Sequence, residues 1–296
     1  MVDVPSRISE ADIILTVGHY RAPGKVMKKW QLNSISHGLS HRNVLGKIIS
    51  KGKKKLTFRL DGLRRIYAPE AWEADEPLIE NLDLADSVVF QSNYSRNCFS
   101  EQGIECPEYQ DIIINGAKSE LFFPKSNCKL NPKNVSLISN SWSRNHNKGF
   151  KTIAQFSRLD NVSVIHIGTW PSDIPSEKVQ LMGIMEEKKI GDVLRRGHFL
   201  LFPSKNEACP NVVVEALACG LPVLYHDTGG TPELCQDGKL GLALPENIQH
   251  PNLFNDFLDK ALSLHGTMRA RILERMNDFS FRKCYENYIQ HFHSLI

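Results

Sequence analysis

Two carboxylates stand in or beside an apolar stretch of the sequence, NEACPNVVVEALACGLPV, which runs from Asn206 to Val223. Glu207 comes just before the apolar run, and Glu215 lies within it. The run from Asn211 onward predicts a helix that is apolar on almost every side and therefore buried. An ionised carboxylate without a partner would be costly in such surroundings. Glu215 therefore needs a partner, which is either a buried lysine or arginine or a ligand.

The ends of the predicted helix favour a ligand. Pro210 suits its first turn, where a missing N–H costs little, and Gly220 followed by Pro222 ends it. The free N–H groups at its start, for instance those of Asn211 and Val212, add to the positive end of the helix dipole. Together they form an anion site that suits a phosphate group.

The position of Glu215 fits a nucleotide whose phosphates lie at this helix start. Glu215 comes five residues after Pro210, which is roughly 7.5 Å along an α-helix. The ribose of a nucleoside diphosphate lies about that far from the distal phosphate. A carboxylate at this point can accept hydrogen bonds from both ribose hydroxyls. Pairing of Glu215 with a protein cation stays open as the alternative.

Short β-rich runs alternate with helical stretches, which indicates parallel βαβ units. Strand candidates are residues 12–17, 55–60, 87–92 and 111–115, then 134–139, 162–168, 199–204 and 222–227. A polar break at 124–134 separates the two sets. We therefore expect an α/β fold with two Rossmann-like, doubly wound parallel-sheet domains facing a cleft. They span residues 1–126 and 127–280, and a final helix at 281–296 packs back on the first domain.

Polar and charged side chains follow three strands of the second set. The three loops carry Ser141, Arg144 and Lys148, then Glu207, and then Gly229 with Gly230. Ligands of doubly wound proteins bind at the carboxyl ends of the strands. We therefore expect these loops to form one binding site.

These residues resemble the E-x7-E signature of retaining GT-B glycosyltransferases, specifically glycosyltransferase family 4 (the group 1 glycosyl transferases). Glu207 and Glu215 have the spacing, and EALACGLPV and GGTPEL follow the pattern. Asn115-Gly116 with Leu121–Pro124, and Lys148-Gly149, resemble other family segments. RLDG, ADSVVFQS and FSFRKCYENY add weaker similarities, so the resemblance covers roughly residues 55–290.

The resemblance implies a role for each matching residue. Glu215 would bind the ribose of a sugar nucleotide such as a UDP- or GDP-sugar, and Glu207 would contact the donor sugar. Lys148 would neutralise the departing diphosphate. The backbone at Asn211 and the loop of Gly229 and Gly230 would line the donor pocket, together with Ser141 and Arg144. No metal or other cofactor is implied, because lysine and helix dipole supply the electrostatic stabilisation.

Several positions depart from the family pattern. Trp142 stands where an arginine is usual, with Arg144 nearby as a substitute. Ala208-Cys209-Pro210 replaces the small residues that often follow the first glutamate, and Lys118 stands where an aspartate is common. We also expect the first domain to be shortened. Within it, Asp61 at the end of RLDG is the candidate that faces the sugar, although it also suits a turn before glycine.

These features predict a glycosyltransferase of the hexosyltransferase type (EC 2.4). It would move a sugar with retention onto a saccharide or lipid-linked acceptor, in polysaccharide or lipopolysaccharide biosynthesis. The alternatives are a GT-B-shaped sugar-nucleotide epimerase and a non-catalytic sugar-nucleotide-binding protein. An epimerase needs acid and base residues from both domains, and the first domain offers no convincing set.

Charge and cysteine content bear on partners and location. Residues 1–66 contain fourteen Lys or Arg and four Asp or Glu. The basic stretch 25–55 is thus a candidate for peripheral contact with an anionic membrane or acceptor, and a solvated loop is the alternative. The pI of about 8.4 and the absence of interleaved aromatics argue against nucleic acid. Seven scattered cysteines without C-x-x-C argue against a disulfide framework or a zinc site. We expect a cytoplasmic protein, with the inner face of the membrane as a peripheral location.

Overall fold

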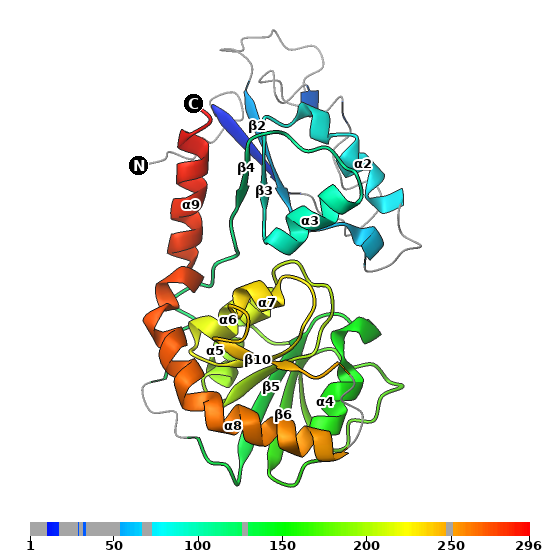
Figure 1. Cartoon of the computed structure of the whole chain (residues 1–296), viewed down its shortest axis with the longest axis vertical. Helices are drawn as coiled ribbons and strands as arrows, with labels where there is room; N and C mark the ends of the chain where they lie inside the picture. The colour runs from blue at the N-terminus through cyan, green and yellow to red at the C-terminus, as the bar shows by residue number, and fades with distance from the viewer. Residues whose placement is uncertain are drawn as a thin grey trace. The chain divides into compact units, whose positions relative to one another are not determined.

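The computed structural model describes residues 11–17, 29, 32–33, 54–66, 73–125, 130–246 and 251–296. The chain divides into two compact units. The first unit comprises Met1–Ile114 and Tyr285–Ile296, and the second comprises Asn115–Cys284. Both units are coloured by position along the chain in Figure 1. Each contains a parallel sheet, so the expected α/β class is confirmed.

The first unit is built on four parallel strands in the order β1-β2-β3-β4. They are β1 (Ile13–Val17), β2 (Lys55–Leu60), β3 (Ser87–Phe90) and β4 (Gln110–Ile112). Its helical segments are η2 (Arg64–Ile66), α2 (Glu76–Ile79), η4 (Leu82–Leu84) and α3 (Asn93–Glu101). Apolar side chains such as Phe58, Phe90 and Phe99 form its core. The hydroxyl of Ser92 accepts a hydrogen bond from the Ser95 amide at 3.0 Å and caps α3.

The second unit contains a six-stranded parallel sheet in the order β10-β9-β8-β5-β6-β7. The strands are β5 (Val135–Ser141), β6 (Val162–Gly168), β7 (Val179–Gly183), β8 (Phe199–Phe202), β9 (Val223–His226) and β10 (Gly241–Leu244). Helices of this unit are η5 (His146–Lys148), α4 (Phe150–Phe156), α5 (Glu187–Leu194), α6 (Asn211–Ala218), α7 (Thr231–Leu234), α8 (Pro251–Glu274) and η6 (Met276–Phe279). The main core cluster joins alternate strand residues, such as Phe199 and Leu201, to α4 and α8.

The order of the strands locates the site before any side chain is considered. From β5 the chain adds β6 and β7 on one side, then crosses over to place β8, β9 and β10 on the other. The order thus reverses between β5 and β8. In doubly wound sheets the ligand binds at the carboxyl ends of the strands beside such a reversal.

All eight strand candidates from the sequence correspond to strands, with ends shifted by a few residues. Two strands, β7 and β10, escaped prediction. β7 is an edge strand whose last four residues are exposed, so it carries no buried apolar run. β10 has only four residues and begins with Gly241.

The units divide between Ile114 and Asn115, ahead of the polar break at 124–134. The segment after Ile114 is tied into the second unit by hydrogen bonds. Ala117 bonds through its backbone to Phe279 and Phe281, each at 2.8 Å, and Arg195 donates to the carbonyl of Leu121 at 2.6 Å. The last helix, α9 (Phe281–His293), begins in the second unit, and its residues from Tyr285 count with the first.

Within the first unit, α9 is anchored by one buried histidine. His291 is only 1% exposed, and its Nε2 and Nδ1 lie 2.9 Å from Ser87 Oγ and 2.7 Å from Asp111 Oδ2. These bonds join β3, β4 and the C-terminal helix.

Some expectations concern residues that the structure describes only in part. Most of the basic stretch 25–55 lies outside the described residues, so its proposed membrane contact stays a prediction. In the described part of the chain, no helix is long and apolar enough to cross a bilayer. The six cysteines of that part, which exclude Cys128, are free thiols.

Candidate functional site: a pocket at the strand reversal of the second unit

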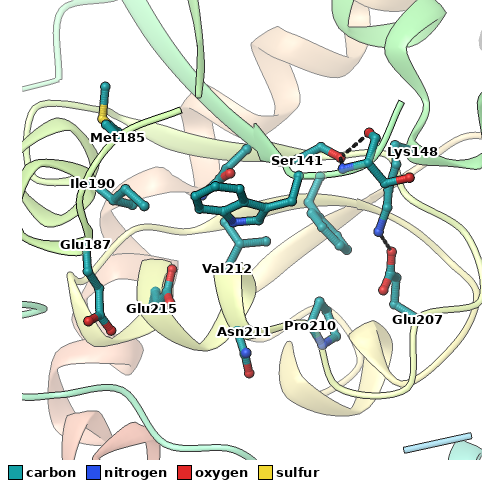
Figure 2. A pocket seen from close by; sticks show the side chains of 14 residues that line it. Ser141, Lys148, Met185, Glu187, Ile190, Glu207, Pro210, Asn211, Val212 and Glu215 are labelled. Atoms are coloured by element: carbon teal, nitrogen blue, oxygen red, sulfur yellow. Dashed lines mark hydrogen bonds and ion pairs between the residues drawn. The ribbon is translucent and has the colours of Figure 1, made fainter. Parts of the chain in front are cut away.

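A pocket of about 550 Å³ lies at the carboxyl ends of β5 and β8. It is therefore at the strand reversal, where the topology predicts a ligand. Figure 2 shows Lys148 and Glu207 on one side of it and Glu187, Ile190 and Met185 on the other. The described residues that line it are Asn140, Ser141, Trp142, Ser143, Lys148, Met185, Glu187, Ile190, Phe202, Glu207, Pro210, Asn211, Val212 and Glu215.

Lys148 and Glu207 form an ion pair between Nζ and Oε1 on one side of the pocket. Their side chains are 25% and 20% exposed, so the pair is only partly screened by solvent. Ser204 donates a hydrogen bond to the same Glu207 oxygen at 2.8 Å. This arrangement brings together the two residues that the sequence singled out from different loops.

Glu207 is held by its backbone as well as by its side chain. Its carbonyl accepts a hydrogen bond from the Gly230 amide at 2.7 Å. A Cβ on Gly229, whose φ is +76°, would lie 2.5 Å from that carbonyl oxygen. Asn206, also left-handed with φ of +58°, donates to the Thr228 hydroxyl at 3.2 Å. Gly229 and Gly230 are not among the described residues that line the pocket; they support the loop that presents Glu207.

A second close backbone contact, between Gly149 and Pro203, fixes the position of Lys148. Gly149 follows Lys148 with φ of +73°, and a Cβ there would lie 2.5 Å from the carbonyl oxygen of Pro203. The Lys205 amide also donates to the carbonyl of Asn147 at 3.0 Å. These backbone contacts explain why glycine follows the lysine, since any other residue would push the two loops apart.

The start of α6 lies beside this pair. Pro210 is its N-cap, one position earlier than the first turn expected from the sequence, and its carbonyl accepts from the Val213 amide at 3.0 Å. The amides of Asn211 and Val212 precede the first intrahelical donor, so they are available to an anion. Pro210 therefore removes no donor from the first turn of α6.

Asn115 ties this helix start to the segment that follows β4. Its Nδ2 donates to the Asn211 side-chain oxygen at 2.6 Å and to the Cys209 carbonyl at 3.0 Å. Its own amide donates to the Cys209 sulfur at 3.4 Å. The Asn-Gly motif of the sequence thus helps to position the loop between Glu207 and α6.

Glu215 faces the pocket rather than the sheet. It is half-buried, whereas Val213, Val214 and Leu217 of the same helix are almost fully buried. The helix is therefore not buried on every side, because its Glu215 side lines a cavity. No described residue makes an ion pair or a hydrogen bond with Glu215, so no described lysine or arginine is its partner.

The electrostatic surroundings of Glu215 favour its neutral form. Burial, followed by the nearby Glu187 carboxylate, raises the pKa of Glu215 to about 7, and Lys118 acts in the opposite direction. Lys118 itself pairs with Glu187 at 2.6 Å. The unusual lysine of the Asn-Gly segment thus provides a positive charge near this end of the pocket.

Of the remaining predicted site residues, Ser141 lines the pocket, whereas Arg144 and Asp61 are not among the described lining residues. Ser141 is buried in the pocket wall, where its hydroxyl donates to the Ser143 carbonyl at 2.8 Å and accepts from the Ser143 amide at 3.2 Å. Arg144 is exposed and is not among the described lining residues. Asp61 belongs to the first unit, with Oδ1 at 3.7 Å from a guanidinium nitrogen of Arg59.

The structure adds lining residues that were not predicted. Asn140 and Phe202 could have been found, because each lies at the carboxyl end of a predicted strand. Glu187 and Ile190 lie on α5, which follows the unpredicted strand β7. In the described part of the chain, no group of three or more His, Cys, Asp or Glu side chains is placed to hold a metal ion.

Comparison with protein families identifies the class of this unit. Residues 141–264 match the family model described as "Glycosyl transferases group 1". This segment contains every described residue that lines the pocket except Asn140. The pocket-bearing part of the second unit thus resembles group 1 glycosyltransferases.

Two kinds of curated relative match the chain over part of their length. The phosphatidylinositol N-acetylglucosaminyltransferase gpi3 subunit of Schizosaccharomyces pombe is 30% identical over 155 residues, which is 40% of this chain and 34% of that protein. A D-inositol 3-phosphate glycosyltransferase of Mycobacterium leprae is 30% identical over 99 residues, which is 33% of this chain and 22% of that protein. The matches thus span about a third or less of these relatives.

Solved structures extend the likeness to the whole fold. Sucrose-phosphate synthase from Thermosynechococcus elongatus superposes with a TM-score of 0.71 at 16% identity, covering 96% of this chain and 73% of that one. Anabaena Alr3699/HepE, solved with UDP and glucose, gives 0.63 at 18% identity, covering 81% and 72%. At this identity the likeness shows the fold, which is GT-B-like.

Proposed function

We propose that the protein is a glycosyltransferase that transfers a sugar from a nucleoside diphosphate sugar to a saccharide or lipid-linked acceptor. One observation carries the proposal: the Lys148–Glu207 pair, the start of α6 and Glu215 line one pocket. The free amides of α6 suit the phosphates, and Glu215 suits the ribose hydroxyls. Lys148 supplies positive charge where the leaving diphosphate would develop negative charge.

The proposed reaction retains the configuration at the anomeric carbon. The acceptor oxygen forms a bond to that carbon on the face from which the diphosphate leaves, as the bond from carbon to phosphate oxygen breaks. The acceptor proton passes to the departing phosphate. Lys148 neutralises the charge on this leaving group, and Glu207 holds hydroxyls of the transferred sugar. Asp61 of the first unit is the candidate that faces the sugar from the acceptor side.

The acceptor is proposed from charge and from the relatives. The basic stretch 25–55 suits an anionic or membrane-bound acceptor, and the relatives are named for phosphatidylinositol and inositol 3-phosphate. An acceptor panel should therefore hold lipid-linked saccharides, phosphorylated inositols and polysaccharide fragments. The proposal needs no metal, so turnover is expected to survive EDTA.

The test begins with a thermal-shift panel of UDP- and GDP-sugars, because a bound ligand stabilises the folded state by mass action. Release of UDP or GDP is then measured, without acceptor and with the acceptor panel. Slow nucleotide release that Lys148→Ala abolishes supports the transferase. Epimerised donor indicates an epimerase, and binding without turnover under every acceptor indicates a binding protein. A panel in which no sugar nucleotide binds would refute all three.

A further inference from the structure

One buried polar group in the pocket has no hydrogen-bond partner among the described residues. This group is the side-chain oxygen Oδ1 of Asn140, which is inaccessible to solvent. The residue is 8% exposed and lines the pocket from the penultimate position of β5. A buried amide without a partner destabilises the free protein, so such groups in native proteins call for an explanation.

An aromatic ring accompanies this amide. Trp142 lies two residues after Asn140, in the bend that directly follows β5. Both residues line the pocket, and Trp142 is 59% exposed. In the described part of the chain its ring packs on no other aromatic ring and its indole N–H makes no hydrogen bond. Trp142 therefore offers free apolar surface beside an unsatisfied amide.

The charged groups that line the pocket do not come from the end of β5. This part of the pocket wall therefore suits a neutral part of the ligand. The charged side chains come from other elements. Glu187 lies on α5 and Glu215 on α6, while Lys148 lies in η5 and Glu207 in the loop before α6. The end of β5 contributes only the amide of Asn140, the hydroxyls of Ser141 and Ser143, and the indole of Trp142. Ser141 and Ser143 already bond to one another.

The chemistry of a carboxamide narrows what it can recognise. It presents one acceptor and two donors on one plane, so its best partner both donates and accepts. A phosphate oxygen can only accept, and it would leave Oδ1 unsatisfied. A sugar hydroxyl or a sugar acetamido group does both, and the apolar C–H face of a sugar ring can pack on an indole.

We propose that Asn140 and Trp142 read the transferred sugar of the donor: the carboxamide binds a hydroxyl or acetamido group, and the indole packs on the ring. This assignment rests on the proposed function. Asn140 lies near the end of β5, and Lys148 lies in η5, which follows that strand. The partner of Lys148, Glu207, is the proposed sugar contact on the loop between β8 and α6. Because a site with buried polar groups rejects a ligand that cannot satisfy them, this pair would determine donor specificity.

The test compares nucleotides with and without a sugar by calorimetric titration. The probes are UDP, UDP-glucose and UDP-N-acetylglucosamine, with GDP and GDP-mannose in parallel. Asn140→Leu and Trp142→Ala are expected to weaken the favoured sugar nucleotide about 10-fold or more, with little change for the bare diphosphate. Trp142→Phe should restore most of the affinity, because it keeps an aromatic face. A larger loss for the acetamido sugar identifies that group, and an equal loss for both sugars identifies a hydroxyl.

The melting temperature of the free protein distinguishes a role of Asn140 in ligand recognition from a role in holding the fold. Asn140→Leu removes an unsatisfied amide of similar size, so the melting temperature of the free protein should stay the same or rise. The matched control Asn161→Leu removes an amide that donates to the Pro132 carbonyl at 2.9 Å, and it should leave sugar-nucleotide affinity unchanged. A destabilised Asn140→Leu, or an equal loss for UDP and UDP-sugar, would overturn the inference. Unchanged affinities would overturn it while leaving the proposed function intact, whereas a wild-type protein that binds none of the probes would sink both.

Discussion

At the scale of single residues, the charged side chains form two groups at different ends of the pocket. Lys148 and Glu207 neutralise one another at one end, and Glu187, Glu215 and the nearby Lys118 occupy the other. A diphosphate would have to compete with Glu207 for the lysine. Glu215 would have to lose a proton before it could accept from both ribose hydroxyls. Both features lead to predictions that single substitutions can check.

Lys148→Ala is expected to reduce turnover by about 10²- to 10³-fold, because it would remove the cation that is proposed to stabilise the leaving diphosphate. Among the described residues, it also leaves the carboxylate of the half-buried Glu207 with the Ser204 hydrogen bond alone. The measurement is nucleotide release at saturating donor. Lys151→Ala, an exposed lysine three residues further on, is the matched control and should be unaffected. Normal turnover in Lys148→Ala would contradict the role given to this residue.

The raised pKa of Glu215 predicts a pH-dependent stability. Because its pKa in the folded free protein is about 7, above the ordinary 4.5, its stabilising contribution is complete below pH 4.5 and is lost as pH rises through 7. Glu215→Gln should therefore stabilise the free protein above pH 7, by up to about 3 kcal/mol. Denaturant unfolding at pH 5 and pH 8 measures this difference. Equal stabilisation by the glutamine at both pH values would refute it.

Nucleotide binding should show the opposite trend with pH. Only the ionised Glu215 accepts from both ribose hydroxyls, so affinity for UDP or GDP is expected to rise between pH 6 and pH 8. The phosphate of the ligand also titrates in this range. The Glu215→Gln variant is therefore the reference, and its pH dependence should be clearly weaker than that of the wild type in calorimetric titrations.

At the scale of elements, two close backbone contacts bring the loops that carry Lys148 and Glu207 together. Gly149 allows the loop after β5 to approach the end of β8, and Gly229 allows the loop after β9 to approach Glu207. Asn115 adds side-chain hydrogen bonds to the start of α6. The placement of Lys148 and Glu207 thus depends on backbone geometry that only glycine tolerates.

Gly229→Ala should lower both stability and sugar-nucleotide affinity. The added Cβ would lie 2.5 Å from the Glu207 carbonyl oxygen, so the loop must move. Gly183→Ala is the matched control, since its φ of +68° is similarly left-handed but no heavy atom lies within 4 Å of the added Cβ. The control should lose about 1 kcal/mol from backbone strain alone. Melting temperatures of the two variants give the comparison, and similar losses in both would argue against the contact with Glu207.

At the scale of the whole molecule, the two units have separate cores. The pocket and the segment that matches the group 1 glycosyltransferase model lie in the second unit. The first unit has its own core of Phe58, Phe90 and Phe99, and it is completed by the C-terminal residues of the chain. Its stability therefore depends on α9, which is contributed from the far end of the sequence.

His291→Ala should destabilise the first unit by about 2–4 kcal/mol, because it leaves a cavity and removes the partner of Ser87 and Asp111. Calorimetry is expected to show one transition shifted to lower temperature and the other unchanged. Saturating nucleotide should raise only the transition of the second unit. His293→Ala, an exposed histidine of the same helix, is the control. A shift of both transitions by His291→Ala would mean that the units unfold together.

The sequence predicted much of this architecture for identifiable reasons. Buried strands such as β5, β6 and β8 have continuous apolar runs, and α6 has an apolar run that ends at Gly220 and Pro222. The sequence did not predict β7, because four of its five residues are exposed and it has no buried apolar run. Glu187 consequently went unrecognised, since nothing in the local sequence distinguishes it from Glu186, and both residues are exposed.

The sequence by itself determined the parallel α/β class, the spacing of Glu207 and Glu215, and the lysine after β5. These follow from local apolar patterns and from motifs confined to single loops. Only the tertiary structure decided that Lys148 pairs with Glu207. It also decided that, among the described residues, Glu215 has no cation as an ion-pair partner and Asn140 Oδ1 has no hydrogen-bond partner. The physical reason is that these relations depend on the reversal of strand order between β5 and β8, which brings together residues far apart in the chain.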